Sequence, residues 1–233
     1  MKAVLFDLDG TLLPMDYDLF IKYYFGSLAK KFAPLGYDAE KLINAVWHGT
    51  EAMGKNDGST TNEEVFWKTF ASDLGERVLK DKVVFEDFYA NEFQNIEKLC
   101  SVNQKADELV KSLKNKGYKV VLATNPLFPD IATSSRIRWA NLEKKDFDLY
   151  TTYENSSFSK PNLAYYEDIA TKIGVAPEDC LMVGNDVDED MVAKKCGMEV
   201  FLVTDCLLNK HNLDINEFPH GTFDDLIEYL KTK

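Results

Sequence analysis

The stretch AVLFDLDGT, residues 3–11, is an apolar run that leads straight into two aspartates. The run predicts a short strand that is buried on both faces of a sheet. Residues two apart on a strand point to the same side, so Asp7 and Asp9 should start out facing the same way before Gly10 lets the chain turn. Two neighbouring carboxylates raise each other's pKa unless something neutralises them. The stretch therefore predicts a bound cation or chemistry that uses paired carboxylates, with a frayed strand end and two incidental acids as the alternative.

A helical segment follows this strand. From residue 16 to about residue 100 apolar side chains recur at helical spacing, and no clear strand interrupts them. A first helix should end at Pro34–Gly36 and a second should cover about 38–53. Thr61 and Glu64 form a capping-box pattern that opens a third helix, and a further helical region is expected over 83–99. The pattern predicts an all-helical insertion directly after the first strand.

The rest of the chain alternates between helices and strands. Repeated strand–helix units predict right-handed crossovers and a largely parallel sheet with helices on both faces, which is an α/β fold. The expected strands cover about 118–123, 147–152, 180–183 and 198–203, and the expected helices about 103–116, 128–139, 163–173, 186–195 and 222–230.

Composition narrows the class of protein. The chain has 233 residues, of which 45% are hydrophobic and 28% charged, as in ordinary soluble domains. Its formal net charge of -12 and the absence of a Lys/Arg cluster argue against nucleic-acid binding. No apolar run has the length of a membrane span and no signal peptide is recognisable, so the expected location is the cytoplasm, with no membrane partner. The four cysteines and three histidines form no zinc pattern, and the cysteines are expected to be buried, reduced thiols.

Polar residues follow three of the predicted strands. Asp7 and Asp9 come after the first strand, Thr124–Asn125 after the next, and Asn185–Asp186 after a later one, while Ser159–Pro161 lies in a loop just before a helix. In open parallel sheets, ligands bind outside the carboxyl ends of the strands. The fold should therefore gather these side chains at one edge of the sheet.

Each of these residue types has a chemical use. Asp7, Asp9 and Asp186 could hold a hard cation such as Mg²⁺. Thr124 offers a hydroxyl to an anion and Lys160 offers a positive charge to phosphate. A carboxylate can also attack phosphorus and form an aspartyl phosphate. Taken singly, these features are also typical of turns and helix starts; their joint occurrence at strand ends favours a site.

Four short motifs in this order resemble the haloacid dehalogenase (HAD) superfamily, most of whose members are Mg²⁺-dependent phosphatases. The matching segments are Asp7–Thr11, Ala123–Asn125, Ser159–Pro161 and Gly184–Asp190. The resemblance implies a Rossmann-like core domain from residues 1–14 and 102–233. It also implies a helical cap of the C1 type, residues 15–101, inserted between the first two motifs.

The resemblance also implies roles for the paired acids. Asp7 would be the nucleophile, and Asp9 would be the general acid for the leaving alcohol and then the base for water. Mg²⁺ would be bound by Asp7, the backbone carbonyl of Asp9, and Asp186. The acid at Asp9 separates this chain from haloacid-type dehalogenases, which lack one there.

The remaining motif residues would bind the phosphate or support the metal. Thr124, Asn125 and Lys160 are expected to bind substrate, and Lys160 also to neutralise the nucleophile. Asp190 would be a metal ligand or a partner of one. Asn185 stands where many members have Asp, so it could share the metal role.

The expected function is hydrolysis of a small phosphorylated metabolite by a monomer or weak homodimer. A phosphomutase or a phosphonate hydrolase on the same scaffold are alternatives, although the cap lysines Lys22 and Lys55 lack a context that marks a Schiff-base lysine. A phospho-acceptor receiver domain would be about half as long and would lack the insertion. A catalytically inactive phosphate-binding or interaction protein is a further alternative.

The aromatic residues of the insertion leave substrate choice open. They could line a substrate pocket or form the core between the cap helices. The candidates are Tyr17, Tyr23, Tyr24 and Trp47.

Overall fold

The computed structural model describes all residues, 1–233, and has a six-stranded parallel sheet at its centre. The strand order is β3-β2-β1-β4-β5-β6, so the chain moves outward from β1 first in one direction and then in the other. This order confirms the predicted Rossmann-like α/β class, and it places the topological switch point beside β1. The strands are β1 (Ala3–Phe6), β2 (Lys119–Leu122), β3 (Leu149–Tyr150), β4 (Cys180–Gly184), β5 (Glu199–Val203) and β6 (His220–Gly221).

The first strand is the centre of the fold, as its apolar run predicts. All four of its residues are 0% exposed, and it pairs in parallel with β2 on one side and β4 on the other. Val4 and Phe6 pack into one hydrophobic cluster, and Ala3 and Leu5 into another on the opposite face. Both faces of the sheet are therefore covered.

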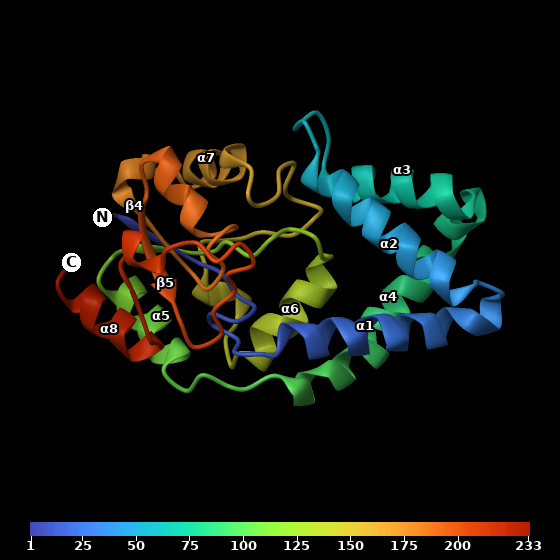
Figure 1. Ribbon diagram of the computed structural model, residues 1–233, viewed down its shortest axis with the longest axis horizontal. Helices are drawn as coiled ribbons and strands as arrows, with labels where there is room; N and C mark the ends of the chain where they lie inside the picture. Colours follow the sequence, from blue (N-terminus) through green and yellow to red (C-terminus); the bar gives the residue numbers. More distant parts are fainter.

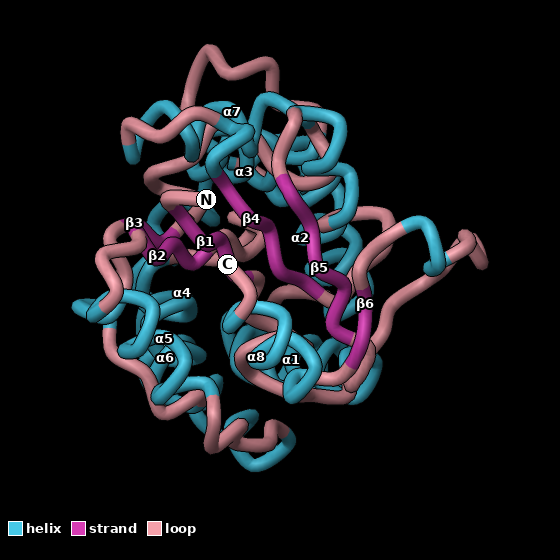
Figure 2. Tube along the Cα trace, turned by 90° about the vertical axis from the view of Figure 1, so that its left-hand side faces the viewer, coloured by secondary structure: helices cyan, strands magenta, loops and turns pink.

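Helices cover the two faces unequally (Figure 2). α5 (Ala106–Asn115), α6 (Asp130–Trp139) and α8 (Phe223–Lys231) contribute to the cluster that contains Val4 and Phe6. α7 (Leu163–Ile173) and the short 3₁₀ helix Met191–Cys196 contribute to the other cluster. No helix is both long enough and apolar enough to cross a bilayer.

The prediction of a helix over 186–195 is wrong for the first half of that range. The structure has a turn there, and only Met191–Cys196 is helical, as a 3₁₀ helix. The carboxylate of Asp186 accepts the backbone N–H groups of Asp188 and Glu189, at 2.8 and 2.9 Å. These bonds from the i+2 and i+3 N–H groups hold the turn around the carboxylate.

Three smaller expectations also need correction. The strand expected over 147–152 is only Leu149–Tyr150, and the edge strand β6 is too short to leave a pattern in the sequence. The helical region 83–99 is divided at Asn91 into α4 (Lys82–Ala90) and a 3₁₀ helix, Glu92–Leu99. All four cysteines are free, but only Cys180 is fully buried.

The segment between β1 and α5 contains helices and no strand, and it forms the other half of the molecule (Figure 1). Besides α4 it contains α1 (Tyr17–Phe32), α2 (Ala39–Gly54) and α3 (Asn62–Leu74), with 3₁₀ turns at Ala33–Leu35 and Glu76–Asp81. The larger hydrophobic cluster runs without a break from the sheet into these helices. The division into a core domain and a cap over 15–101 stays a prediction, and we use the word cap for that segment below.

Buried hydrogen bonds fasten the cap to two loops of the core, the one after β2 and the one that ends at Lys160. Asn62, the first residue of α3, is 0% exposed. Its side-chain Nδ2 donates to the carbonyl of Pro126 at 3.3 Å and to Ser159 Oγ at 3.0 Å, and its backbone N donates to the carbonyl of Ser156 at 2.8 Å. The second loop leads directly into the predicted phosphate lysine, so one end of α3 is tied to the site.

Candidate active site

The predicted site residues converge outside the carboxyl ends of β1, β2 and β4. A cavity of about 90 Å³ lies there, at the switch point of the sheet. Lys160 reaches it from the loop before α7 through contacts with two of the lining acids. The predicted residues that line the cavity are Asp7, Asp9, Thr124, Asn125, Asn185, Asp186 and Asp190.

Asp7 is held at the end of β1 by both its backbone and its side chain. Its backbone N donates to the carbonyl of Val183 at 2.8 Å, which extends the pairing with β4 by one residue. Its Oδ1 accepts from Lys160 Nζ at 2.8 Å, and its Oδ2 accepts a longer bond from Thr11 Oγ1 at 3.4 Å. The carboxylate is thus fixed and faces a positive charge, as a nucleophile on phosphate would need.

Lys160 is the buried cation of the site. Its side chain is 1% exposed, and its Nζ lies 2.8 Å from Asp7 Oδ1 and 2.5 Å from Asp190 Oδ1. Burial acts to lower the pKa of Lys160, but the Asp190 and Asp7 carboxylates together hold it well above its usual value. Its backbone N donates to Asn125 Oδ1 at 3.2 Å. Asn125 therefore positions the lysine, in addition to lining the cavity.

Two glycines make room for this arrangement. A Cβ at Gly184 would lie 2.0 Å from Asp190 Oδ2, so the last residue of β4 must be glycine for that carboxylate to approach. Gly10 has φ +86°, and a Cβ there would lie 2.3 Å from Asn185 Nδ2. The turn after Asp9 and the packing beside Asp190 both depend on a missing side chain.

The amide of Asn185 is used by the protein itself. Its Nδ2 donates to the carbonyl of Cys206 at 2.7 Å, and its Oδ1 accepts from Thr11 Oγ1 at 3.1 Å. A carboxylate at this position could not donate to Cys206. Asp186 is then the free acid of the pair, and its orientation is fixed because Oδ1 accepts two backbone N–H groups.

Other polar residues stabilise the surroundings of the acids. The carbonyl of Thr124 accepts from Thr151 Oγ1 at 2.6 Å and from the Tyr165 hydroxyl at 2.9 Å, which fixes the end of β2. Glu189 accepts from Asn125 Nδ2 at 3.0 Å, and burial raises its pKa to about 7. For Asp190, burial is the largest influence on the pKa and raises it against the pull of Lys160.

Arg136 is a residue of the site that the sequence reasoning missed. It lies on α6, its side chain is 1% exposed, and its guanidinium pairs with the Asp9 carboxylate. Burial raises the pKa of Asp9, although the neighbouring Arg136 counteracts part of this rise. An arginine four residues after Ala132 and four before Ala140, both fully buried, falls on the buried face of its helix. That spacing is the signal that could have identified it, because a buried arginine needs a partner.

The excess of carboxylates over basic groups at the site favours the binding of a metal cation. The carboxylates outnumber the basic groups, so the cluster remains acidic before a phosphate arrives. No three His, Cys, Asp or Glu side chains form a ready-made metal cluster. Mg²⁺ binds through one or two carboxylates and keeps several waters. Asp9 pairs with Arg136 through Oδ2, while its Oδ1 is buried without a hydrogen-bond partner. The carboxylates are Asp7, Asp9, Asp186, Glu189 and Asp190, and the basic groups are Arg136, Lys160 and Lys210.

Comparison with known proteins agrees with this geometry. A curated phosphoglycolate phosphatase of Vibrio parahaemolyticus is 26% identical over 211 residues, which cover 88% of this chain and 84% of the relative. A putative pyrophosphatase PpaX of Clostridium perfringens is 28% identical and is covered completely, as is this chain. The crystal structure of a HAD phosphatase from Thermococcus onnurineus superposes with a TM-score of 0.64 at 21% identity, over 99% of this chain and 98% of that one.

The family model adds the assignment. The model of the haloacid dehalogenase-like hydrolases matches residues 1–197, a range that contains all four motifs and the whole helical insertion. The match covers most of the chain, from the strand that precedes Asp7 to beyond the motif that ends at Asp190. The protein is therefore an enzyme that belongs to the haloacid dehalogenase-like hydrolases.

Proposed function

We propose that this enzyme is a Mg²⁺-dependent phosphatase that hydrolyses a small phosphomonoester through an aspartyl-phosphate intermediate. The observation that carries the proposal is the buried Lys160, which bridges Asp7 and Asp190 at the carboxyl end of the central strand. A buried cation beside a fixed carboxylate supplies both the nucleophile and the charge that phosphoryl transfer requires. Relatives named as phosphatases support the same reaction class.

In the first half-reaction, Asp7 attacks the phosphorus atom. A bond forms between its carboxylate oxygen and phosphorus while the bond from phosphorus to the leaving oxygen breaks. Asp9, whose pKa is raised by burial, delivers its proton to that leaving oxygen. Lys160 stays charged throughout, and Thr124 lines the phosphate cavity from the end of β2.

In the second half-reaction, water attacks the aspartyl phosphate. Asp9, now a carboxylate stabilised by Arg136, takes a proton from the water. The bond from phosphorus to the Asp7 oxygen breaks, which restores the nucleophile and releases inorganic phosphate. Bound Mg²⁺, held by Asp7, the backbone carbonyl of Asp9 and Asp186, would neutralise charge on the phosphoryl oxygens.

The alternatives have less support. A phosphonate hydrolase needs a lysine that reaches the reacting carbon, but Lys22 is exposed, and Lys55 is exposed and pairs with Glu51. A phosphomutase would use the same residues and differs in passing the phosphoryl group to a second hydroxyl. Release of free phosphate separates it from a hydrolase. The small phosphorylated metabolite, the cytoplasmic location and the monomer or weak homodimer stay predictions.

The deciding experiment measures phosphate release from a panel of phosphomonoesters with Mg²⁺ and with excess chelator. We expect turnover only with the metal. Asp7→Asn should abolish turnover without changing the circular dichroism spectrum. Asp224→Asn, at an exposed ion pair on α8, is the matched control and should retain full activity. Turnover by Asp7→Asn equal to the wild type would overturn Asp7 as nucleophile, and a folded enzyme inactive on the whole panel would overturn the function.

A further inference from the structure

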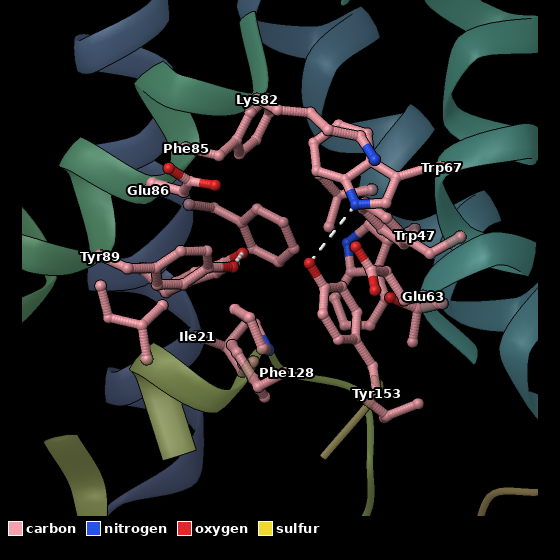
Figure 3. Close-up of a pocket in the computed structure, with 18 of the residues that line it drawn as sticks. Ile21, Trp47, Glu63, Trp67, Lys82, Phe85, Glu86, Tyr89, Phe128 and Tyr153 are labelled. Carbon is pink, nitrogen blue, oxygen red and sulfur yellow. Dashed lines mark hydrogen bonds between the residues drawn. The ribbon is translucent and has the colours of Figure 1, made fainter. Parts of the chain in front are cut away.

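A second cavity, of about 120 Å³, lies between the cap and the core (Figure 3). Its lining comes from all four cap helices and from the core segment that follows β2. Of its 19 lining residues, 14 are hydrophobic, and most of these are aromatic. Three of the four aromatic residues that the sequence left open, Tyr17, Tyr24 and Trp47, line it, whereas Tyr23 does not.

The walls of this cavity are mainly aromatic, with four polar residues among them, Thr50, Glu63, Lys82 and Glu86. The hydroxyl groups of Tyr24 and Tyr89 bond to each other at 2.9 Å, and Trp67 Nε1 donates to the Tyr153 hydroxyl at 3.4 Å (Figure 3). The ammonium of Lys82 lies 4.5 Å from the centre of a Trp67 ring. The aromatic groups satisfy one another, so the faces that they turn to the cavity are apolar.

The cavity is larger than the voids that imperfect packing leaves in protein interiors. Protein interiors are close-packed, and voids larger than a water molecule are few. An engineered apolar cavity of about 150 Å³ binds benzene, so a cavity of about 120 Å³ matches a group of about one ring. Tyr17 and Trp47 on its rim are 40% and 45% exposed, so the space is open to ligands at that edge.

This aromatic cavity is contiguous with the site of the proposed reaction. Tyr17, Leu127 and Phe128 line both cavities. The ring of Phe128 lies 4.5 Å below the guanidinium of Arg136, which pairs with Asp9. The group that would protonate the leaving oxygen thus stands at the wall between the two spaces. A leaving alcohol that extends from Asp9 past these shared residues would reach the aromatic cavity.

We propose that the aromatic cavity binds the organic part of the substrate, and that the enzyme therefore prefers phosphomonoesters of apolar, ring-sized alcohols over those of small or charged ones. This inference rests on the proposed phosphatase function and deepens it. It assigns to Tyr24, Val46, Trp47 and Phe128 a part in substrate choice.

The test compares two esters with matched chemistry. Ethyl phosphate and 2-phenylethyl phosphate are both esters of primary alcohols, so their intrinsic reactivities are similar. Burial of the phenyl ring should raise kcat/KM for 2-phenylethyl phosphate at least about tenfold over ethyl phosphate, chiefly through KM. Equal values of kcat/KM for the two esters would overturn the inference and leave the phosphatase function standing. Hydrolysis of neither ester, nor of any other phosphomonoester, would overturn the function instead.

A cavity-filling variant localises the effect. Val46 is buried and lines the cavity, and Val46→Phe should remove most of the preference, measured as the ratio of kcat/KM for the phenyl ester to that for ethyl phosphate. Val83→Phe is the matched control, because Val83 lies on α4, is 64% exposed and does not line the cavity. An unchanged preference in folded Val46→Phe would contradict the assignment of the cavity.

A binding measurement on the unmodified enzyme keeps the test independent of turnover and of the variant's folding. Two of the three tryptophans, Trp47 and Trp67, line the cavity. Titration with 2-phenylethanol should change tryptophan fluorescence in a saturable way, whereas ethanol at the same concentrations should not. No saturable change with 2-phenylethanol would overturn the inference.

Discussion

The two cavities that meet at Tyr17, Leu127 and Phe128 are stabilised by different kinds of interaction. In the polar cavity a few specific ion pairs hold the charged groups, such as those of Lys160 with Asp7 and Asp190 and of Arg136 with Asp9. In the aromatic cavity many similar rings share the contact area, and no single ring is indispensable. A substitution in the first should therefore disturb the whole cluster, and one in the second should change only a fraction of the binding surface.

Removal of the central cation should have the largest effect. Lys160→Met leaves two buried carboxylates without a partner, so we expect a loss of about 3–5 kcal/mol in the free energy of unfolding. Activity should fall at least about a hundredfold, since a preorganised positive charge is lost. Denaturant titration and phosphate release measure the two losses. Lys172→Met, at a surface ion pair on α7, is the control, and an equal loss of stability there would contradict the role of burial.

A methyl group at the end of β4 should have the next largest effect. Gly184→Ala places a Cβ against the Asp190 carboxylate and displaces it from Lys160. Misplacement by about an ångström at a reacting site costs on the order of a hundredfold in rate. Gly26→Ala, in α1 with no atom near its Cβ, should instead stabilise the protein by about 0.5–1 kcal/mol and leave activity unchanged. Wild-type kinetics in Gly184→Ala would show that Asp190 has room to spare.

Arg136→Lys should have a more selective effect. A lysine keeps the charge but loses the planar guanidinium that holds Asp9 and lies against Phe128, so proton transfer should weaken by about tenfold. The loss should appear in kcat for alkyl phosphates and should be much smaller for 4-nitrophenyl phosphate, whose leaving group needs no proton. Arg138→Lys, on the exposed side of the same helix, is the control. Equal losses on both substrates would point to a purely structural role for Arg136.

The smallest effect is expected in the aromatic cavity. Trp47 is 45% exposed and forms only one part of the wall. Trp47→Ala should raise KM for 2-phenylethyl phosphate about threefold and leave ethyl phosphate unchanged, because only part of the ring's contact area is lost. Steady-state kinetics with both esters measure this. A KM that rises equally for both would indicate a general disturbance of the cap.

The polar cavity could be predicted from the sequence to a large extent. An apolar run marks β1, β2 and β4, and polar residues follow each of them. A parallel sheet brings such ends together, so the sequence alone could place Asp7, Thr124 and Asp186. The central position of β1 followed from its uninterrupted apolar residues. What the sequence could not show is the set of partners inside the site, such as the use of Asn125 to position Lys160.

The remaining features depend on information that no local pattern carries. Arg136 lies on a helix outside every motif, and its partner Asp9 is 127 positions away. Aromatic residues at helical spacing look the same whether they fill a core or surround a space, so the role of Tyr24 or Trp47 was open. The turn at Asp186, which its carboxylate holds by accepting two backbone N–H groups, leaves the same local pattern of acids as a helix start.

The buried hydrogen bonds of Asn62 affect the route by which substrate enters and product leaves the enzyme. Its buried hydrogen bonds join the cap to the loop that carries Lys160, so lifting the cap at this side breaks several bonds worth about 1 kcal/mol each and shifts the lysine as well. Opening at the rim where Tyr17 and Trp47 are exposed costs less free energy, so substrate and alcohol should exchange there. The cap is thus anchored on the side of the catalytic residues. We expect the alcohol to leave past the aromatic rim while the cap still shields the phosphoryl group from solvent.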